Sequence, residues 1–268
     1  MDIANYYSGD YQQCQLTIEG DYIMNGQATG TVINCTNYGG QAIGIQLGKG
    51  CVIRGLQIIG QFVSPSTSNL TNYYNTTYAN YTDKNGNCST FYSGIAIDPY
   101  TPTSGTPGST AITIENCYIS GFTNAVNISC GGALNAEMIT VKYCSFGMCR
   151  TCVQSNKGQE KLNIIEHCMA WSSCFCFFQS GYNNAQSGYY HIHDINIAGN
   201  MIQPFYVNQQ GWFPLKADHI YAEGISSIGN LYTGAMGIDI SDCTFQFADP
   251  AVIGVHYLAY TNNVNVIF

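Results

Sequence analysis

The sequence predicts an all-β fold, a single-stranded parallel β-helix with a long loop excursion at residues 61–92. The first observation behind this prediction is the phrase Ile112–Gly121, in which apolar and polar residues alternate around one corner residue, as in a β-strand. The second is that the phrase recurs, after Cys117, at intervals of 18 to 30 residues. One inward position of the successive copies holds Leu56, Cys117, Cys144, Cys168, Ile195, Ile225 and Cys243. Strand units repeated at such a period stack on one another, because no unit buries its apolar face alone.

Two further inward positions follow from the same alignment, and both are mostly apolar, as a buried position requires. The position two residues later reads Ile58, Ile119, Phe146, Ala170, Ile197, Ser227 and Phe245. The position three residues earlier reads Ile53, Ile114, Val141, Ile165, Ile192, Ala222 and Ile240. Ser227 is the one exception in the first of these two columns.

The chain has 13 cysteines, and we expect those that recur in the phrase to be reduced. Cys117, Cys144 and Cys168 occupy the same position of successive coils, where neighbouring strands lie about 4.8 Å apart with parallel side chains. A disulfide needs closer Cβ atoms that point toward each other. The predicted arrangement is therefore an inward stack of thiols that pack as small apolar groups. The pair Cys149 and Cys152 has zinc-like spacing, but no second pair completes a site.

A second strand follows the phrase in several coils. It is predicted at 42–45, 94–97, 125–128, 151–153, 175–178 and 204–207. Gly60, Gly121 and Gly199 mark the turn before it. Residues 1–32 have weak periodicity and are expected to form an N-terminal cap or first coil, ahead of a β-helix over 33–268. Excursions rich in Asn, Thr, Tyr and Ser at 61–92, and in Pro and Gly at 99–110, interrupt that helix.

The composition excludes several classes of function. Only 9% of the residues are charged and the net charge is −8, so the chain lacks the basic surface that nucleic acids need. No segment has the 18 or so apolar residues of a membrane span, and the first residues lack the pattern of a signal peptide. A polar surface with few charges favours a virion surface or an extracellular setting.

The outward positions of the later coils hold the candidate functional residues. In the alignment above, Glu166 and Glu223 fall two coils apart in one column, about 9.5 Å between Cα atoms, with His193 between them. That spacing suits an inverting glycoside hydrolase, in which one carboxyl group protonates the leaving oxygen and the other activates water. The candidate catalytic residues are Glu166, Glu223 and Asp239. The candidate glycan-binding residues are His191, His193, Tyr221, Trp171 and Trp212.

Two other interpretations of these residues stay open. The column Arg54, Glu115, Lys142, Glu166, His193 and Glu223 alternates in sign, which is also what a structural ladder of favourable neighbours requires. The cluster Glu166, His191, His193 and Asp194 could instead bind a metal, although no sequence spacing demands one and we predict none. No cofactor is expected, because the sequence has no phosphate-binding loop or dinucleotide fingerprint.

The phrases at Ile112–Gly121, Ile139–Phe146 and Ile238–Phe245, together with Ser93–Tyr100, resemble the right-handed β-helix superfamily of pectate lyases, polygalacturonases and phage tail spikes. The resemblance covers roughly residues 31–260 and implies a right-handed winding. The paired-Asp and Gly-His-Gly signatures of polygalacturonases do not occur, and Arg54 and Arg150 are the only arginines for a lyase. The resemblance therefore favours the tail spikes, which are homotrimers that bind, and in some cases cleave, host surface glycans.

These observations lead to three hypotheses. The first is a structural protein of a virion or cell surface, of spike or fibre type, that binds host surface polysaccharide as a homotrimer and contacts other virion proteins. The second is a spike-type polysaccharide depolymerase that uses paired carboxylates. The third is a purely structural filament or shell subunit.

Overall fold

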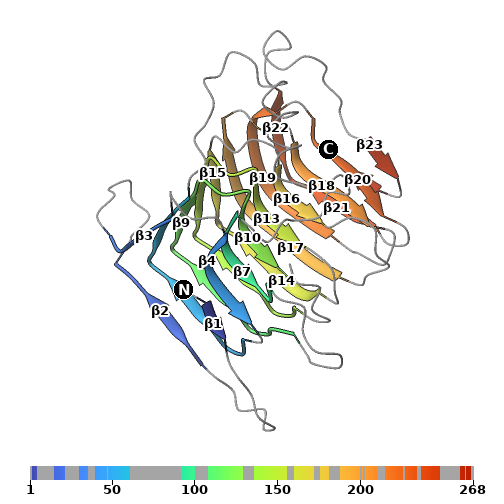
Figure 1. The fold of residues 1–268 in the computed structure, drawn as a ribbon. Coiled ribbons are helices and arrows are strands. Elements are labelled where there is room, and N and C mark those ends of the chain that lie inside the picture. The colour runs from blue at the N-terminus through green and yellow to red at the C-terminus, as the bar shows by residue number, and fades with distance from the viewer. Residues whose placement is uncertain are drawn as a thin grey trace.

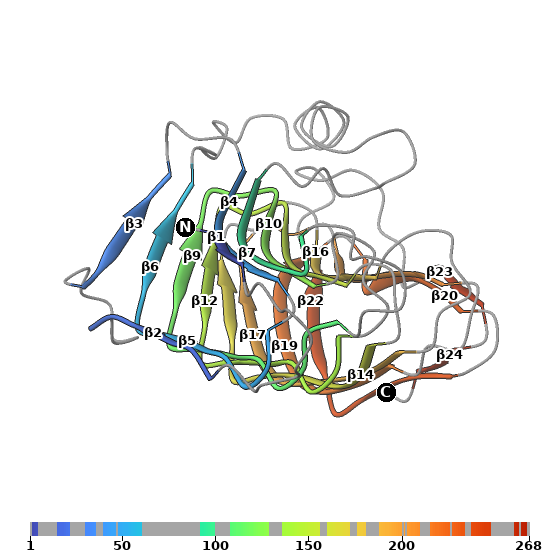
Figure 2. The ribbon, with the colours of Figure 1, turned by 60° about the horizontal axis from the view of Figure 1, so that its bottom comes forward.

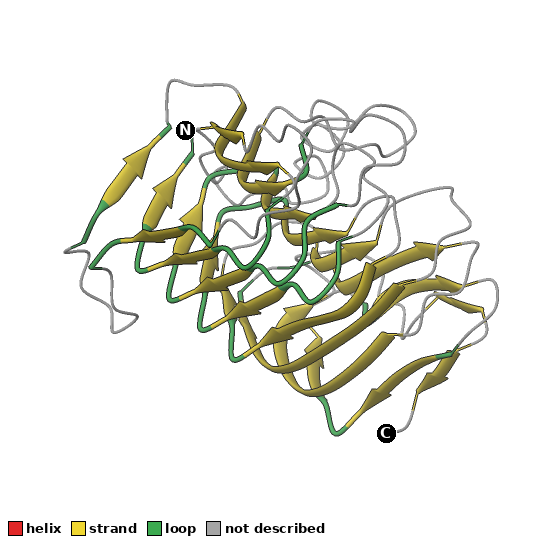
Figure 3. Cartoon of the chain, turned by 90° about the horizontal axis from the view of Figure 1, so that it is seen from below, coloured by secondary structure: helices red, strands yellow, loops and turns green. Residues whose placement is uncertain are grey.

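The structure of the chain is a computed structural model. The described residues are 2–4, 15–21, 30–35, 40–46, 48–60, 92–99, 108–128, 136–155, 160–171, 176–180, 188–199, 201, 203–209, 215–225, 227–233, 237–247, 260–262 and 264–266. Among these residues every element is a strand and every strand pairing is parallel (Figure 3). The predicted parallel β-solenoid is confirmed.

Three parallel ladders run side by side along the solenoid (Figure 1). The first ladder contains β1 (Asp2–Ala4), β4 (Gly40–Gln46), β7 (Tyr92–Ile97), β10 (Asn124–Ile128), β13 (Thr151–Ser155), β16 (Cys176–Ser180), β18 (Gln203–Gln209), β20 (Gly229–Thr233) and β23 (Tyr260–Asn262). These strands include the second strand that the sequence predicts in several coils.

The repeated phrase builds two short strands on either side of a corner, rather than one. The strands before the corner form the second ladder: β2 (Thr17–Glu19), β5 (Val52–Arg54), β8 (Thr113–Glu115), β11 (Thr140–Lys142), β14 (Glu160–Glu166), β17 (Gly188–Ala198), β19 (Leu215–Ile225), β21 (Ile238–Ser241) and β24 (Val264–Val266). Those after it form the third ladder: β3 (Val32–Asn34), β6 (Gln57–Ile59), β9 (Tyr118–Ser120), β12 (Ser145–Gly147), β15 (Met169–Trp171) and β22 (Thr244–Phe247), together with the second halves of β17 and β19. The long strands β17 and β19 run through the corner and join the two ladders into one sheet.

The corner residue adopts the same left-handed backbone conformation in successive coils. Its φ is +68° at Gly55 and between +51° and +53° at Asn116, Tyr143, His167, Asp194, His219 and Asp242. Residues other than glycine rarely adopt this conformation, and Asn, Asp and His tolerate it best. Five of these seven corners carry Asn, Asp or His. The sequence thus turns the chain at one place in each coil and aligns the second and third ladders.

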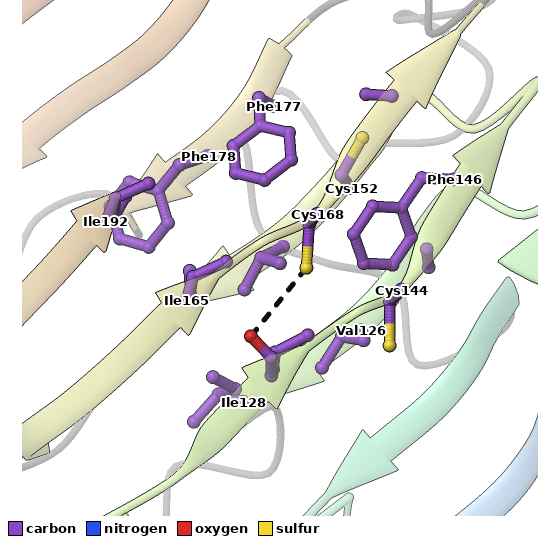
Figure 4. Close-up of a cluster of buried hydrophobic side chains, with 14 of the residues drawn as sticks. Val126, Ile128, Cys144, Phe146, Cys152, Ile165, Cys168, Phe177, Phe178 and Ile192 are labelled. Atoms are coloured by element: carbon purple, nitrogen blue, oxygen red, sulfur yellow. Dashed lines mark hydrogen bonds between the residues drawn. The ribbon is translucent and has the colours of Figure 1, made fainter. Parts of the chain in front are cut away.

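The three ladders enclose one apolar core (Figure 2). Cys117, Cys144 and Cys168 are fully buried and follow one another along the solenoid, as predicted. Each thiol contacts the carbonyl oxygen two residues before it; Cys168 Sγ, for example, lies 3.2 Å from Glu166 O and 3.7 Å from Val141 O (Figure 4). All nine described cysteines are free. The predicted column of reduced thiols is confirmed.

Burial keeps the core thiols in their neutral form. It raises the pKa of Cys144 well above 9.0 and raises the pKa of Cys243 to about 11. A neutral thiol behaves as a small hydrophobic group. Phe146, Phe177 and Phe178 fill the remaining space, with the Phe146 and Phe177 ring centroids 6.1 Å apart (Figure 4).

The coil containing β19 has a different register from the predicted one. Ile220, not Ile225, is the partner of Ile195, so the corner of this coil is His219 rather than Gly224. The inward column of Ile197 continues to Ala222, and Ser227 does not belong to it. The predicted register is wrong because the pattern Ala-x-x-Ile occurs twice in this strand, at Ala217–Ile220 and at Ala222–Ile225.

The central strands of the first ladder are buried on both of their sides. Every residue of β10, β13 and β16 is buried, including polar ones that bond along the ladder. Asn127 Nδ2 donates to Ser93 Oγ at 3.2 Å, and Thr151 Oγ1 donates to Gln179 Oε1 at 3.3 Å. The predicted excursion at 61–92 lies outside the described residues except for Tyr92, which begins β7. Of the excursion at 99–110, residues 100–107 also lie outside them.

The N-terminal strands belong to the ladders. β1 pairs with β4, β2 with β5 and β3 with β6. The described parts of residues 1–32 therefore continue the ladders, and the division into an N-terminal cap or first coil at 1–32 and a β-helix at 33–268 stays a prediction.

Candidate functional site

The outward side of the second ladder carries a column of alternating charge. In register along the ladder it reads Glu19, Arg54, Glu115, Lys142, Glu166, His193, Asp218 and Ser241. Arg54 Nη2 lies 2.9 Å from Glu19 Oε1, and Lys142 Nζ lies 3.2 Å from Glu115 Oε2. Pairs this exposed contribute about 0–1 kcal/mol each. The alternation predicted from the sequence is present, and the structure extends it with Glu19 and replaces Glu223 by Asp218.

Four of the five histidines of the chain gather where this column meets the corner. The histidine cluster consists of His167, His191, His193 and His219, with the carboxylates of Glu166, Asp194 and Asp218. His191 and His193 alternate with Ile192 on β17 and therefore point to the same outward side. His167 and His219 are corner residues two coils apart, and Asp194 is the corner residue of the coil between them.

His193 lies at the centre of the histidine cluster. Its Nε2 is 3.1 Å from Glu166 Oε2, and its Nδ1 is 2.9 Å from Asp194 Oδ2. Both contacts are hydrogen bonds only when both ring nitrogens carry protons, because a carboxylate oxygen only accepts. Asp194 also lies 3.5 Å from His167 Nδ1. The geometry therefore places Glu166 and Asp194 beside imidazole nitrogens of the cluster.

Asp218 is the most deeply placed carboxylate of the cluster. Its Oδ2 accepts from Lys216 Nζ at 2.7 Å and lies 3.0 Å from His191 Nε2. Burial pushes the pKa of Asp218 upward, but the hydrogen bonds and charges of Lys216 and His191 outweigh burial and hold the pKa below 3.8. A carboxyl group whose pKa is lower in the folded chain stabilises the fold when ionised, and this stabilisation is lost as the pH falls through the folded value.

We expect Asp218→Asn to lower the thermal midpoint at about pH 6 and to lower it by less at about pH 2, because the stabilisation by the ionised carboxyl group is lost as the pH falls through its folded pKa, which lies below 3.8. Melting curves recorded by circular dichroism across this pH range measure the effect. Asp242→Asn, which removes an exposed corner carboxylate, is the matched control. Equal losses for Asp218→Asn at both pH values would contradict the role of Asp218.

No three His, Cys, Asp or Glu side chains of the described ranges are arranged to hold a metal ion. The alternative of a metal bound by Glu166, His191, His193 and Asp194 therefore finds no support in the geometry. The same holds for Cys149 and Cys152, which are both buried in the core.

The predicted catalytic pair is not formed as expected. Glu166 lies on the second ladder, whereas Glu223 lies on the third, where it follows Ala198 in register and accepts a hydrogen bond from Tyr221 Oη at 3.2 Å. Asp239 is exposed and lies beside Lys216, one column away from Glu166. The prediction of Glu166 and Glu223 in one column with His193 between them is wrong, because the register at β19 differs by five residues.

The outward side of the third ladder bears mostly aromatic, apolar and uncharged polar side chains, and we call it the Trp171 face. Its central members are Tyr118, Ser145, Met169, Trp171, Asn196 and Tyr221. Trp171, Met169 and Tyr221 expose 43%, 37% and 37% of their surface. Large apolar side chains grouped on an exposed face indicate an interaction surface.

The preceding coils hold the Trp171 indole in place. Its Nε1 donates to Ser145 Oγ at 2.9 Å, and its ring centroid lies 6.0 Å from that of Tyr118, at an interplanar angle of 31°. The ladder neighbour of Trp171 is Gly147, which has no side chain to separate the two rings. The indole therefore reaches back over Gly147 toward Tyr118.

The predicted glycan-binding residues fall on two different faces. Trp171 and Tyr221 belong to the Trp171 face, whereas His191 and His193 lie across the corner in the histidine cluster. Trp212 lies outside the described residues. Sequence reasoning missed Asp218 and His219 as members of the cluster, and Lys216 as the partner of Asp218. When Ile220 occupies the inward position, it lies 25 residues after Ile195 and 23 residues before Cys243. These nearly equal coil lengths are the signal that could have identified the observed register.

Comparisons with protein-family models, with curated proteins and with solved structures find no significant match. The architecture alone defines the class to which this protein belongs, the all-β parallel β-solenoids. Among the residues described, no helix has the length and apolar character needed to cross a bilayer.

Proposed function

We propose that this chain is a structural solenoid of a virion or cell surface, of spike or fibre type, that binds host surface glycans without cleaving them. The observation that carries the proposal is the Trp171 face, with its exposed aromatic rings and uncharged polar groups. The proposal includes assembly as a homotrimer and contacts with other virion proteins, as the resemblance to tail spikes implies.

The chemistry of the Trp171 face suits a sugar. Binding sites for small ligands combine apolar and aromatic surface with a few polar groups that set orientation. A pyranose presents C–H groups on its ring faces and hydroxyl groups at its edges. Trp171 and Tyr221 supply aromatic surface for the former, and the Asn196 amide supplies hydrogen-bonding capacity for the latter. Stacked coils add an extended and rigid surface along which a polymer can lie.

Binding without cleavage is favoured over the depolymerase hypothesis by the placement of the carboxylates. An inverting hydrolase needs two carboxyl groups on either side of one glycosidic bond. Glu166 and Glu223 lie on different ladders, and Glu166 is 3.1 Å from His193 Nε2. The two carboxyl groups therefore do not share a column, as the predicted catalytic pair requires.

The proposal is tested by incubating the purified chain with capsular polysaccharides and lipopolysaccharides of candidate bacterial hosts. We expect retention of the chain on at least one immobilised polysaccharide, with no increase in reducing ends. Retention accompanied by new reducing ends would replace the proposal by the depolymerase hypothesis. Absence of retention across the panel would reject glycan binding and leave a purely structural subunit.

A further inference from the structure

Charge is distributed unevenly between the two outward faces that meet at the corner. Arg54, Lys142 and Lys216 all lie on the second ladder. Over the described part of the third ladder, the outward positions contain no Lys, Arg or His, and Glu223 is their only charged residue. An anionic ligand on the Trp171 face would meet a carboxylate, no cation among the described outward side chains of this ladder, and a chain of net charge −8.

The two most prominent aromatic side chains of the Trp171 face, Trp171 and Tyr221, follow one another along the solenoid axis. Tyr221 belongs to a coil two turns beyond that of Trp171, which places the two residues roughly 10 Å apart along the solenoid axis. Between them lie Asn196 and Ala198, which are smaller than either aromatic ring. Two aromatic side chains that are separated along the axis by smaller side chains form successive contact points for an extended chain of sugar rings.

The Trp171 indole is ordered before any ligand arrives. Its hydrogen bond to Ser145 Oγ and its contact with Tyr118 hold the ring against the preceding coils. A side chain that is already held in its binding position loses little conformational freedom when a ligand binds. This marks Trp171 as the anchor of the surface, because aromatic residues in such positions commonly carry most of the binding energy.

From these observations we infer that the Trp171 face binds an uncharged, extended glycan that runs along the solenoid axis, with sugar rings stacked on Trp171 and on Tyr221. The inference rests on the proposed function and adds to it the class of glycan and the place where it binds. Uncharged sugars need no cationic partner, and the Asn196 amide lies in the same column as Tyr221, where it can bond hydroxyl groups.

The sequence offers a direct probe, because the chain has only two tryptophans. In a Trp212→Phe background, all tryptophan fluorescence comes from Trp171. We would titrate this variant with four uncharged oligosaccharides, namely chitohexaose, cellohexaose, maltohexaose and mannohexaose. Hexagalacturonate serves as the anionic probe. We expect at least one uncharged oligosaccharide to change the Trp171 emission and to bind more tightly than hexagalacturonate.

Matched variants of the chain with Trp212 intact locate the site by calorimetry. Trp171→Ala is expected to weaken binding of the responding oligosaccharide by about tenfold or more, and Trp171→Phe by less. Tyr143→Ala removes an aromatic side chain of similar exposure, 42%, from the corner column and is expected to leave the affinity unchanged. Circular dichroism of each variant verifies that the solenoid is folded.

Three outcomes would overturn the inference: no response to any of the four uncharged oligosaccharides, tighter binding of hexagalacturonate, or equal effects of Trp171→Ala and Tyr143→Ala. Each of these leaves the proposed function standing if the chain is still retained on an immobilised polysaccharide, and the glycan then binds elsewhere or is acidic. Lack of retention on every polysaccharide would remove both together.

Discussion

Replacing Phe146 by alanine is expected to lower the free energy of unfolding by about 3–5 kcal/mol. Phe146 is fully buried on β12, where Ile119 and Ala170 precede and follow it in register. Its ring meets Phe177 of the first ladder edge-on, with the centroids 6.1 Å apart. The neighbouring Ala170 is too small to fill the space that the ring would leave. The loss therefore combines the transfer of the ring to water with a residual cavity.

Chemical denaturation by guanidinium, followed by circular dichroism, measures this loss. Phe146→Leu is the matched control, because it retains most of the apolar volume and is expected to cost less than half as much. A loss below about 1 kcal/mol for Phe146→Ala would contradict the packing described here, since it would mean that the ring contributes little to the contact between the first and third ladders.

Replacing Gly60 by alanine is expected to destabilise the chain by about 3 kcal/mol, because the new Cβ atom would clash with the main chain of the next coil. A Cβ at Gly60 would lie 2.1 Å from Gly121 O of the next coil, and Gly121 itself has a φ of +81°. Gly60 N also donates to Ser120 O at 2.7 Å, so the two coils cannot separate without breaking a ladder hydrogen bond. The obstacle is main chain, and no rotamer change relieves it.

The matched control is Gly237→Ala, because a Cβ at Gly237 would have no heavy atom within 4 Å. Thermal melting of both variants is expected to show a large decrease in the midpoint for Gly60→Ala and almost none for Gly237→Ala. In a stack of coils, stability depends on contacts between neighbours, so proteolysis of Gly60→Ala should begin in the N-terminal coils. Equal midpoints for the two variants would show that the coils are not as closely spaced at Gly60 as the structure indicates.

Much of the fold was predictable, because the inward positions of the phrase are constrained in two ways at once. A residue such as Cys144 must be apolar to be buried and small enough to stack on Cys117 and Cys168. That combination leaves a repeated signal in the sequence, which located most coils correctly. The corner was also visible, since Asn116 and Asp194 are residue types that tolerate the left-handed conformation.

The register of β19 could not be decided by the same reasoning. Ala217–Ile220 and Ala222–Ile225 present the same spacing, so either pair fits the inward positions. Contact with the preceding coil selects the first, because Ala222 then follows Ile197 in a buried column where Ser227 would have left a hydroxyl group. The candidate site depended on this choice, because the observed register places Asp218, and not Glu223, in the column of Glu166 and His193.

The sequence by itself determined that the chain winds into stacked coils with a core of thiols and aliphatic side chains, because each coil repeats a burial pattern that is local and strong. Only the tertiary structure decided which outward side chains meet. Outward residues carry no requirement to be apolar, and their neighbours come from other coils. The grouping of Trp171 with Tyr118, and of His193 with Glu166, depends on the register between coils, which no single coil specifies.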